Sequence, residues 1–280
     1  MGIIRELDAN LVASSSPQVI NHSLYNNHLF EIDELLRLAK RMPERLVRHN
    51  SGQLPVTTEF HRARELYPTD LSSIESIREI EEANAFVQLM RVERDPAYGE
   101  LVKRCAEQIS DLIKQKVYNP CGWIFISSPN SITPYHRDQE SNFLLQLRGS
   151  KIIHAWNNDD KAVISEKENE EFFGTKGRDA VSYQSNYENS AHEIKLTPGS
   201  GVYLPFTSPH WVENQEQVSI SFSITYFSEE DLRKKTIYRL NGKLRNLGLK
   251  PSPIDHSPMI DRIKWSLFSA YLKLRFGEIY

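Results

Sequence analysis

Cysteine is scarce in this sequence, and only Cys105 and Cys121 occur among its 280 residues. Two cysteines cannot form a disulfide framework, and their spacing matches no zinc motif, so we expect free thiols in a reducing cytosol. Long apolar runs are also missing, and no stretch of about 18 apolar residues predicts a transmembrane helix. The first residues lack the apolar core of a signal peptide. These absences predict a cytoplasmic protein without a membrane span.

An excess of charge of one sign is missing too. The chain has 34 Lys and Arg against 37 Asp and Glu, which gives a net charge of −3. This balance argues against nucleic-acid binding by bulk electrostatics. Hydrophobic residues make up 39% of the chain and charged residues 25%, as in an ordinary globular protein with a substantial buried core.

Helix start signals characterise the first part of the chain. Ser72 and Glu75 have the spacing of a capping box in front of an apolar helical pattern. Asp95–Pro96 predicts a second helix start, with Asp as the N-cap and Pro at the first helical position. That helix is expected to run to about Val117. We therefore predict that residues 1–118 form a helical N-terminal region that packs on the following domain.

After this region the apolar pattern changes from helical to alternating. Short strands separated by Gly, Pro, Asn and Asp turns are typical of a jelly roll. The sequence therefore predicts a mainly β fold, with a double-stranded β-helix (jelly-roll or cupin) core over residues 119–230. Six segments are interpreted as strands: 123–127, 142–147, 151–156, 193–196, 201–204 and 218–227.

Two features of this core predict a cavity. In the last strand, small polar residues (Ser219, Ser221, Ser223 and Thr225) alternate with large apolar ones. Alternate residues point to opposite faces, so one face is expected to line a wet cavity and the other to pack against helices. The segment 157–189 is polar and is interpreted as an insertion. It forms either a lid over the cavity mouth or a plain surface loop, and we slightly favour the lid.

Residues 231–280 return to a helical pattern and form a basic tail. Eleven Lys or Arg stand against two Asp between positions 232 and 276. The charges predict solvated helix faces or, as an alternative, contact with an acidic partner. A helical apolar stripe predicts packing on the core or on a second subunit, so a homodimer through this helix is an open alternative. The stripe consists of Ile260, Ile263, Leu267, Tyr271 and Leu274.

A His-x-Asp pair is the strongest candidate for chemistry. On an extended backbone residues i and i+2 point to the same face, so His136 and Asp138 can both reach one metal ion. His210 lies far downstream, next to another predicted strand, and is the candidate third ligand. Two imidazoles and one carboxylate on one face, with the opposite face open, form the site of non-haem Fe(II) oxygenases.

Other histidines are rival ligands or have structural roles. His154 lies on a strand with apolar neighbours on its own face, so we expect it to be a packing residue. His192 precedes Glu193 and is a weaker rival that could face the cavity. A structural histidine at 136, hydrogen-bonded to Asp138, is a further alternative. Four histidines match no ligand spacing and are expected to be structural or on the surface: His22, His28, His49 and His61.

The stretch 133–151 resembles the JmjC family of Fe(II)- and 2-oxoglutarate-dependent oxygenases. It is most similar to the branch that contains the asparaginyl hydroxylase of hypoxia-inducible factor. That branch has the pattern Thr-Pro-x-His-x-Asp, followed by Asn and then Gly-x-Lys. The resemblance covers about residues 120–228. This sequence supplies each position in order: Thr133, Pro134, His136, Asp138, Asn142, Gly149 and Lys151.

The resemblance implies the ligand and cofactor residues. The iron ligands would be His136, Asp138 and His210. Thr133 and Lys151 would bind the distal carboxylate of 2-oxoglutarate, and Asn142 would support its metal-bound end. The branch has Asn on the last strand, where this chain has Ser223, which still offers a hydrogen bond.

The implied activity is hydroxylation of a C–H bond in a protein, peptide or small molecule. Two alternatives remain: a cupin-like binding or regulatory protein without turnover, and a Zn- or Mn-dependent isomerase or hydrolase. Asn142 and Lys151 favour the oxygenase, because only a 2-oxoglutarate enzyme needs them at these spacings. A buried ammonium is costly unless paired, and a dicarboxylate cosubstrate supplies the partner.

Overall fold

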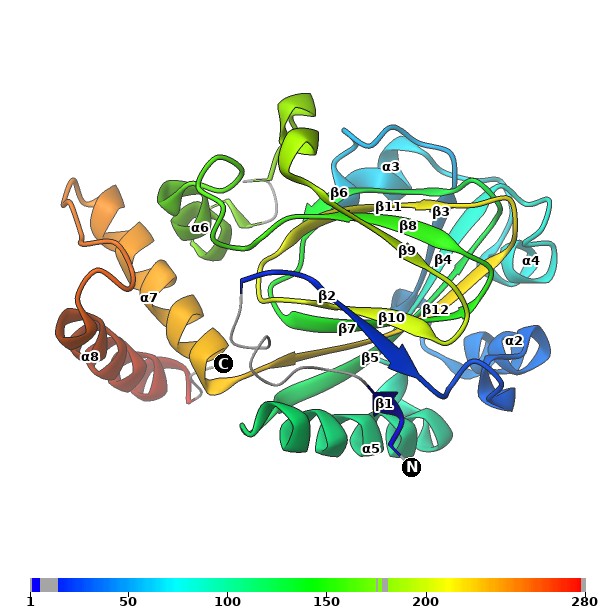
Figure 1. The fold of residues 1–280 in the computed structure, drawn as a ribbon, viewed down its shortest axis with the longest axis horizontal. Coiled ribbons are helices and arrows are strands. Elements are labelled where there is room, and N and C mark those ends of the chain that lie inside the picture. The colour runs from blue at the N-terminus through cyan, green and yellow to red at the C-terminus, as the bar shows by residue number, and fades with distance from the viewer. Residues whose placement is uncertain (1, 6–14, 175, 178–180, 278–280) are drawn as a thin grey trace.

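Two antiparallel sheets face each other in the computed structural model, which describes residues 2–5, 15–174, 176–177 and 181–277 (Figure 1). The larger sheet has the order β1 (Ile4–Arg5), β2 (Gln18–His22), β10 (Ser200–Leu204), β7 (Ser141–Arg148), β12 (Ser219–Phe227), β5 (Tyr118–Ser127), β4 (Ala85–Met90) and β3 (Val47–Ser51). The smaller has the order β6 (Ile132–Arg137), β11 (Pro209–Asn214), β8 (Lys151–Ala155) and β9 (His192–Leu196). The predicted mainly β jelly-roll is confirmed.

Helices cover the outside of the sheets and their ends (Figure 1). The described helices are α2 (Ile32–Arg41), α3 (Ala63–Leu66), α4 (Ser73–Arg78), α5 (Pro96–Ile113), α6 (Glu166–Phe173), α7 (Glu229–Asn246) and α8 (Pro258–Phe276). Short 3-10 helices are η1 (His28–Phe30), η2 (Glu44–Leu46), η3 (Phe60–Arg62), η4 (Val92–Arg94) and η6 (Ser185–Ser190). None of the helices in these residues is long and apolar enough to cross a membrane.

The predicted helix starts are confirmed. The Ser72 side chain and Glu75 form both hydrogen bonds of a capping box at the start of α4. Asp95 caps α5 by accepting a hydrogen bond from the Ala97 amide at 3.1 Å, and Pro96 is the first helical residue. Helix α5 packs on the outer face of the larger sheet, against the apolar face of β12 (Figure 1). The alternation in β12 is therefore confirmed as a two-sided pattern.

The prediction of a helical N-terminal region over residues 1–118 is wrong in part, because this region also supplies β1 to β4. β4 pairs with β5, and β3 pairs with β4. The sequence of β4 is Ala-Phe-Val-Gln-Leu-Met, and such a short apolar run does not distinguish a buried strand from a helix by periodicity. The N-terminal region thus extends the larger sheet as well as packing helices on it.

An apolar cluster joins the inner faces of the two sheets and leaves a cavity beside it. Its buried members are Leu144, Ile153, Ala155, Ile194, Leu196, Val202, Leu204 and Val212. Leu144 and Val212 also line the cavity, whose volume is about 530 Å³. The cluster therefore fixes the spacing of the sheets, and the open space lies between β6 and β11 on one side and β3 to β5 on the other.

Candidate metal and cosubstrate site

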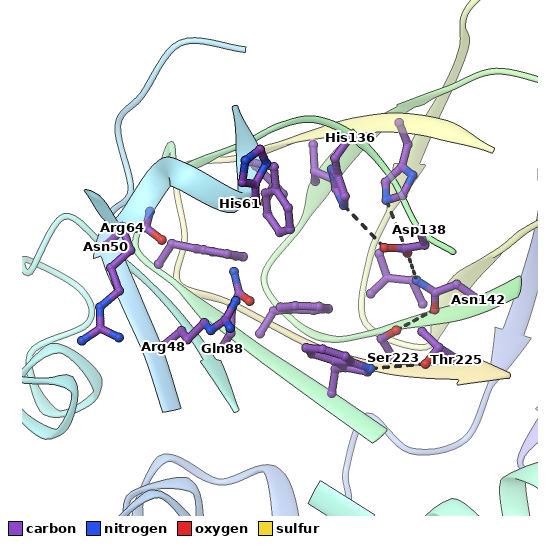
Figure 2. Close-up of a pocket in the computed structure, with 18 of the residues that line it drawn as sticks. Arg48, Asn50, His61, Arg64, Gln88, His136, Asp138, Asn142, Ser223 and Thr225 are labelled. Carbon is purple, nitrogen blue, oxygen red and sulfur yellow. Dashed lines mark hydrogen bonds and ion pairs between the residues drawn. The ribbon is translucent and has the colours of Figure 1, made fainter. Parts of the chain in front are cut away.

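The three predicted ligands meet at one point of the cavity, where Figure 2 labels His136 and Asp138. His136 on β6 lies directly opposite His210 on β11 in the register of the smaller sheet. Asp138 follows β6, and its carboxylate lies 4.0 Å from Nε2 of His136 and 4.0 Å from Nε2 of His210. One ligand atom from each residue lies within 4.8 Å of the others. The donor set fits a metal ion bound by one face.

Backbone carbonyls set the orientation of both imidazoles. Nδ1 of His136 donates to the Pro134 carbonyl at 2.8 Å, and Nδ1 of His210 donates to the Ser208 carbonyl at 3.0 Å. When Nδ1 carries the proton, Nε2 is the basic nitrogen that can bind a metal. The ring of Phe60 stacks on His136 with centroids 4.1 Å apart. Both rings are thus held with Nε2 toward Asp138.

Asp138 is held by a short hydrogen-bonded chain. Nδ2 of Asn142 donates to Oδ2 of Asp138 at 3.2 Å, and the Ser223 hydroxyl donates to Oδ1 of Asn142 at 2.6 Å (Figure 2). Ser223, at the position where the resemblance expects asparagine, therefore orients Asn142. Because Asn142 and Ser223 come from the larger sheet, these hydrogen bonds connect a candidate metal ligand at the edge of one sheet to the facing sheet.

Arg137 lies in the sequence between the candidate ligands His136 and Asp138, and its side chain points to the opposite face. It is buried, and its Nε donates to the Thr207 carbonyl at 3.1 Å. Its guanidinium also bonds Asn169 and lies 4.5 Å from the ring centre of Phe172, both on α6. The insertion is therefore anchored to the back of β6, through a residue that the alternation directs away from the metal.

Lys151 begins β8 and lines the cavity with Thr133. The Lys151 residue is only 4% exposed, and burial lowers the pKa of its ammonium to about 7. In the part of the chain that the structure describes, no carboxylate or hydrogen-bond acceptor pairs with it. A buried cation without a partner fits a site for an anionic ligand that enters the same cavity.

The rival histidines lie elsewhere. His154 stacks on Trp211 with centroids 3.9 Å apart, and its Nδ1 lies 3.2 Å from Glu188 of η6. It is a packing residue, as predicted. His192 is exposed, and its Nε2 lies 2.8 Å from Asn157. Neither is part of the group formed by the predicted ligands.

The insertion does not form the predicted lid over this cavity. None of the described residues of the segment 157–189 lines the cavity of the metal ligands. Instead, Trp156 and Tyr187 form an apolar cluster with Tyr135 and Trp211 from the smaller sheet. Packing within this cluster attaches the insertion to the outer face of the smaller sheet.

The cavity wall opposite the candidate metal ligands was not predicted from the sequence. η3 and α3 contribute Phe60, His61 and Arg64, while β3 and β4 contribute further polar and aromatic residues. His61 was expected to be structural or on the surface, and it is exposed on this wall. No spacing in the sequence connects these residues to the motif, because they approach it only through the pairing of β3 and β4 with β5.

Comparison with known proteins identifies the domain. The family model of the JmjC domain matches residues 101–232. Two structures of the ribosomal oxygenase YcfD from Escherichia coli have the same fold, each with a TM-score of 0.50 and 16% identity. One match covers 98% of this chain and 70% of that chain, and the other covers 99% and 69%. No curated protein sequence matches the chain.

The family match confirms the resemblance to JmjC proteins, while the asparaginyl hydroxylase branch stays a prediction. Together with the His-Asp-His geometry, it supports Fe(II) and 2-oxoglutarate as the cofactors. It also supports an oxygenase of the 2-oxoglutarate class. Residues 101–232 of this chain therefore form a JmjC domain.

Proposed function

We propose that the protein is an Fe(II)- and 2-oxoglutarate-dependent hydroxylase of a C–H bond in a protein, peptide or small molecule. His136, Asp138 and His210 are its iron ligands. The observation that carries this proposal is the partnerless ammonium of Lys151 in the same cavity as the His-Asp-His group. A metal-dependent hydrolase or isomerase has no need for such a group, whereas a dicarboxylate cosubstrate neutralises it.

Each site residue has a separate role in this proposal. Lys151 and Thr133 bind the distal carboxylate of 2-oxoglutarate, and Asn142 orients both Asp138 and the metal-bound end of the cosubstrate. Ser223 holds Asn142 through its hydrogen bond of 2.6 Å. When bound, the iron and 2-oxoglutarate supply the oxidising chemistry. The chain's own residues bind, orient and shield the reacting groups.

The test is consumption of 2-oxoglutarate by the purified protein. With Fe(II) and oxygen, we expect succinate to form in proportion to the 2-oxoglutarate consumed, and chelation of the metal to stop it. Under anaerobic conditions, Fe(II) and 2-oxoglutarate should give the weak visible charge-transfer band of such complexes. A protein that forms neither succinate nor this band would instead be a binding or regulatory member of the fold.

The substrate and the cellular location stay predictions. The similar structures are of a protein described as a ribosomal oxygenase, and its name favours a protein substrate for this chain. Cys105 and Cys121 are both free in the structure, and a cytoplasmic location is our proposal. Domain limits of 1–118, 119–230 and 231–280 are likewise our proposal for how the regions divide.

We further propose that α8 joins two copies of the chain. Its predicted apolar stripe is exposed, with Leu267 at 68% and Leu274 at 90%, whereas Phe268 and Leu272 are buried against the rest of the fold. The exposed stripe lies along one helix face and can pack on its own copy about a two-fold axis. An isologous contact of this kind hides the apolar surface of both copies at once.

Ile263→Asp combined with Leu267→Asp should therefore convert a dimer into a monomer, because each change places a charge in the apolar contact. Light scattering during gel filtration measures the mass. Lys250→Asp, at an exposed position outside the stripe, is the control and should leave the mass unchanged. A wild-type protein that is monomeric at micromolar concentration contradicts this part of the proposal.

A further inference from the structure

The cavity continues from the proposed metal ligands to β3, which is one of the two edge strands of the larger sheet. Arg48 and Asn50 both line it, because alternate residues of β3 point to the same face. In the register of the sheet, Arg48 lies opposite Gln88, and Gln88 lies opposite Phe125. Figure 2 shows Arg48, Asn50, Arg64 and Gln88 at the end of the cavity away from Asp138.

This far end carries two arginines whose charges are not compensated. No hydrogen bond or ion pair of the Arg48 or Arg64 guanidinium occurs within the described ranges. Glu65 lies nearby, but it is 3.0 Å from Arg62 and accepts hydrogen bonds from that residue. Both arginines are exposed, so each can be reached by a ligand that enters from solvent.

The distance between the two arginines and the His-Asp-His group limits which molecules can contact both ends of the cavity. β3 stands four strands away from β7, the strand that carries Asn142. Strands lie about 4.8 Å apart, and arginine side chains shorten the gap, so the two ends are separated by about 10–20 Å. Arg64 is connected to the metal end through Phe60, which precedes it by one helical turn and stacks on His136.

We propose that this end of the cavity binds a carboxylate of an extended acidic peptide, and that the peptide is the substrate. The inference rests on the proposed function. An extended chain advances about 3.3 Å per residue, so the acidic residue should lie about three to six residues from the hydroxylated one. Arginine is suited to this contact, since its guanidinium binds a carboxylate through two parallel hydrogen bonds.

The rest of the cavity favours a peptide over a polyanion. Glu65 and Glu140 also line it, and they repel a ligand with many phosphates while leaving room for a single carboxylate. Between the two charged ends lie aromatic rings that can pack on apolar side chains: Phe60, Phe86, Trp123 and Phe125. The cavity of about 530 Å³ is large enough for several side chains of an extended segment.

Two mixtures of fluorescent twelve-residue peptides test the proposal. They have random sequence, with Glu fixed at three positions in one mixture and Gln at the same positions in the other. Fluorescence anisotropy under anaerobic conditions, with Fe(II) and 2-oxoglutarate, measures binding to the full chain. We expect the Glu mixture to bind tighter, and Arg48→Gln with Arg64→Gln to weaken it about 10-fold or more. The preference for Glu over Gln peptides should then disappear.

Arg48→Glu with Arg64→Glu should reverse the preference, so that mixtures with Lys at the fixed positions bind better than those with Glu. Arg45→Gln with Arg94→Gln removes two exposed arginines outside the cavity, and wild-type selectivity is expected to remain. Equal binding of Glu and Gln mixtures by the wild type overturns the inference. So does a preference for a single-stranded oligonucleotide over both. Succinate formation by the wild type tests the proposed function separately from this inference.

Discussion

Asp138→Ala is expected to abolish formation of succinate from 2-oxoglutarate and to lower the affinity for Fe(II) more than about 100-fold. Its carboxylate lies 4.0 Å from Nε2 of each imidazole, so the change removes the only anionic donor of the group. Two neutral imidazoles on adjacent strands do not hold Fe(II) tightly. The readouts are metal content after gel filtration, succinate yield and the anaerobic charge-transfer band.

Two matched variants distinguish loss of a ligand from general damage. Asp159→Ala removes an exposed carboxylate, and His192→Ala removes an exposed imidazole outside the metal group. Both should keep wild-type metal content and turnover. His136→Ala and His210→Ala should behave like Asp138→Ala. Wild-type succinate yield from any of these three ligand variants means that the metal is bound elsewhere.

Lys151→Met is expected to have opposite effects on stability and on binding. In the absence of 2-oxoglutarate, we expect the variant to melt about 5 °C or more above the wild type, because it removes a buried charge that has no partner. In the presence of 2-oxoglutarate the wild type should gain stability, whereas the variant should not. Thermal unfolding of the metal-loaded protein, with and without the cosubstrate, measures both effects.

The pH dependence of this effect has a definite sign. Burial lowers the pKa of Lys151 from 10.5 to about 7, so between these values the unfolded chain binds more protons than the folded one. The stability of the ligand-free wild type should therefore rise with pH through this range, relative to the variant. Affinity for 2-oxoglutarate should fall above pH 7, because the ammonium loses its proton.

Lys195→Met is the control for this pair of effects, because Lys195 is exposed on the neighbouring strand β9. This change should shift the melting temperature by no more than about one degree, and it should leave the response to 2-oxoglutarate unchanged. If Lys151→Met binds 2-oxoglutarate with unchanged affinity, Lys151 does not contact the cosubstrate.

The central part of the site could be predicted because its residues are close in the sequence. His136, Asp138, Asn142 and Lys151 lie within one motif, and alternation along a strand already directs two of them to the same face. His210 was identifiable only as a histidine beside a strand, and the register of β6 with β11 brings it to the pair. No comparable spacing identified the residues of η3, α3, β3 and β4 that form the opposite wall of the cavity.

Arg48 and Gln88 are ordinary polar residues of short strands, and they become neighbours only when β3 pairs with β4. Their alternation was obscured, because β3 is five residues long and β4 has one polar residue among six. The place of the insertion was equally hidden. It depends on long-range contacts such as that of Trp211 with Glu188, where the indole donates to the carboxylate at 2.9 Å.

Because β6 is an edge strand of the smaller sheet, a metal ion bound there would also affect how firmly this edge is held. β6 is hydrogen-bonded to β11 on one side, and on the other side the amides of Ile132 and Tyr135 donate to the Gly52 and Val56 carbonyls at 2.8 and 3.0 Å. β6 supplies His136, and β11 supplies His210. An ion bound by both histidines would cross-link the two strands, in addition to these backbone hydrogen bonds. Loss of the ion should therefore loosen this edge of the smaller sheet before the apolar interior, so that metal binding would stabilise the folded protein as well as supply its chemistry.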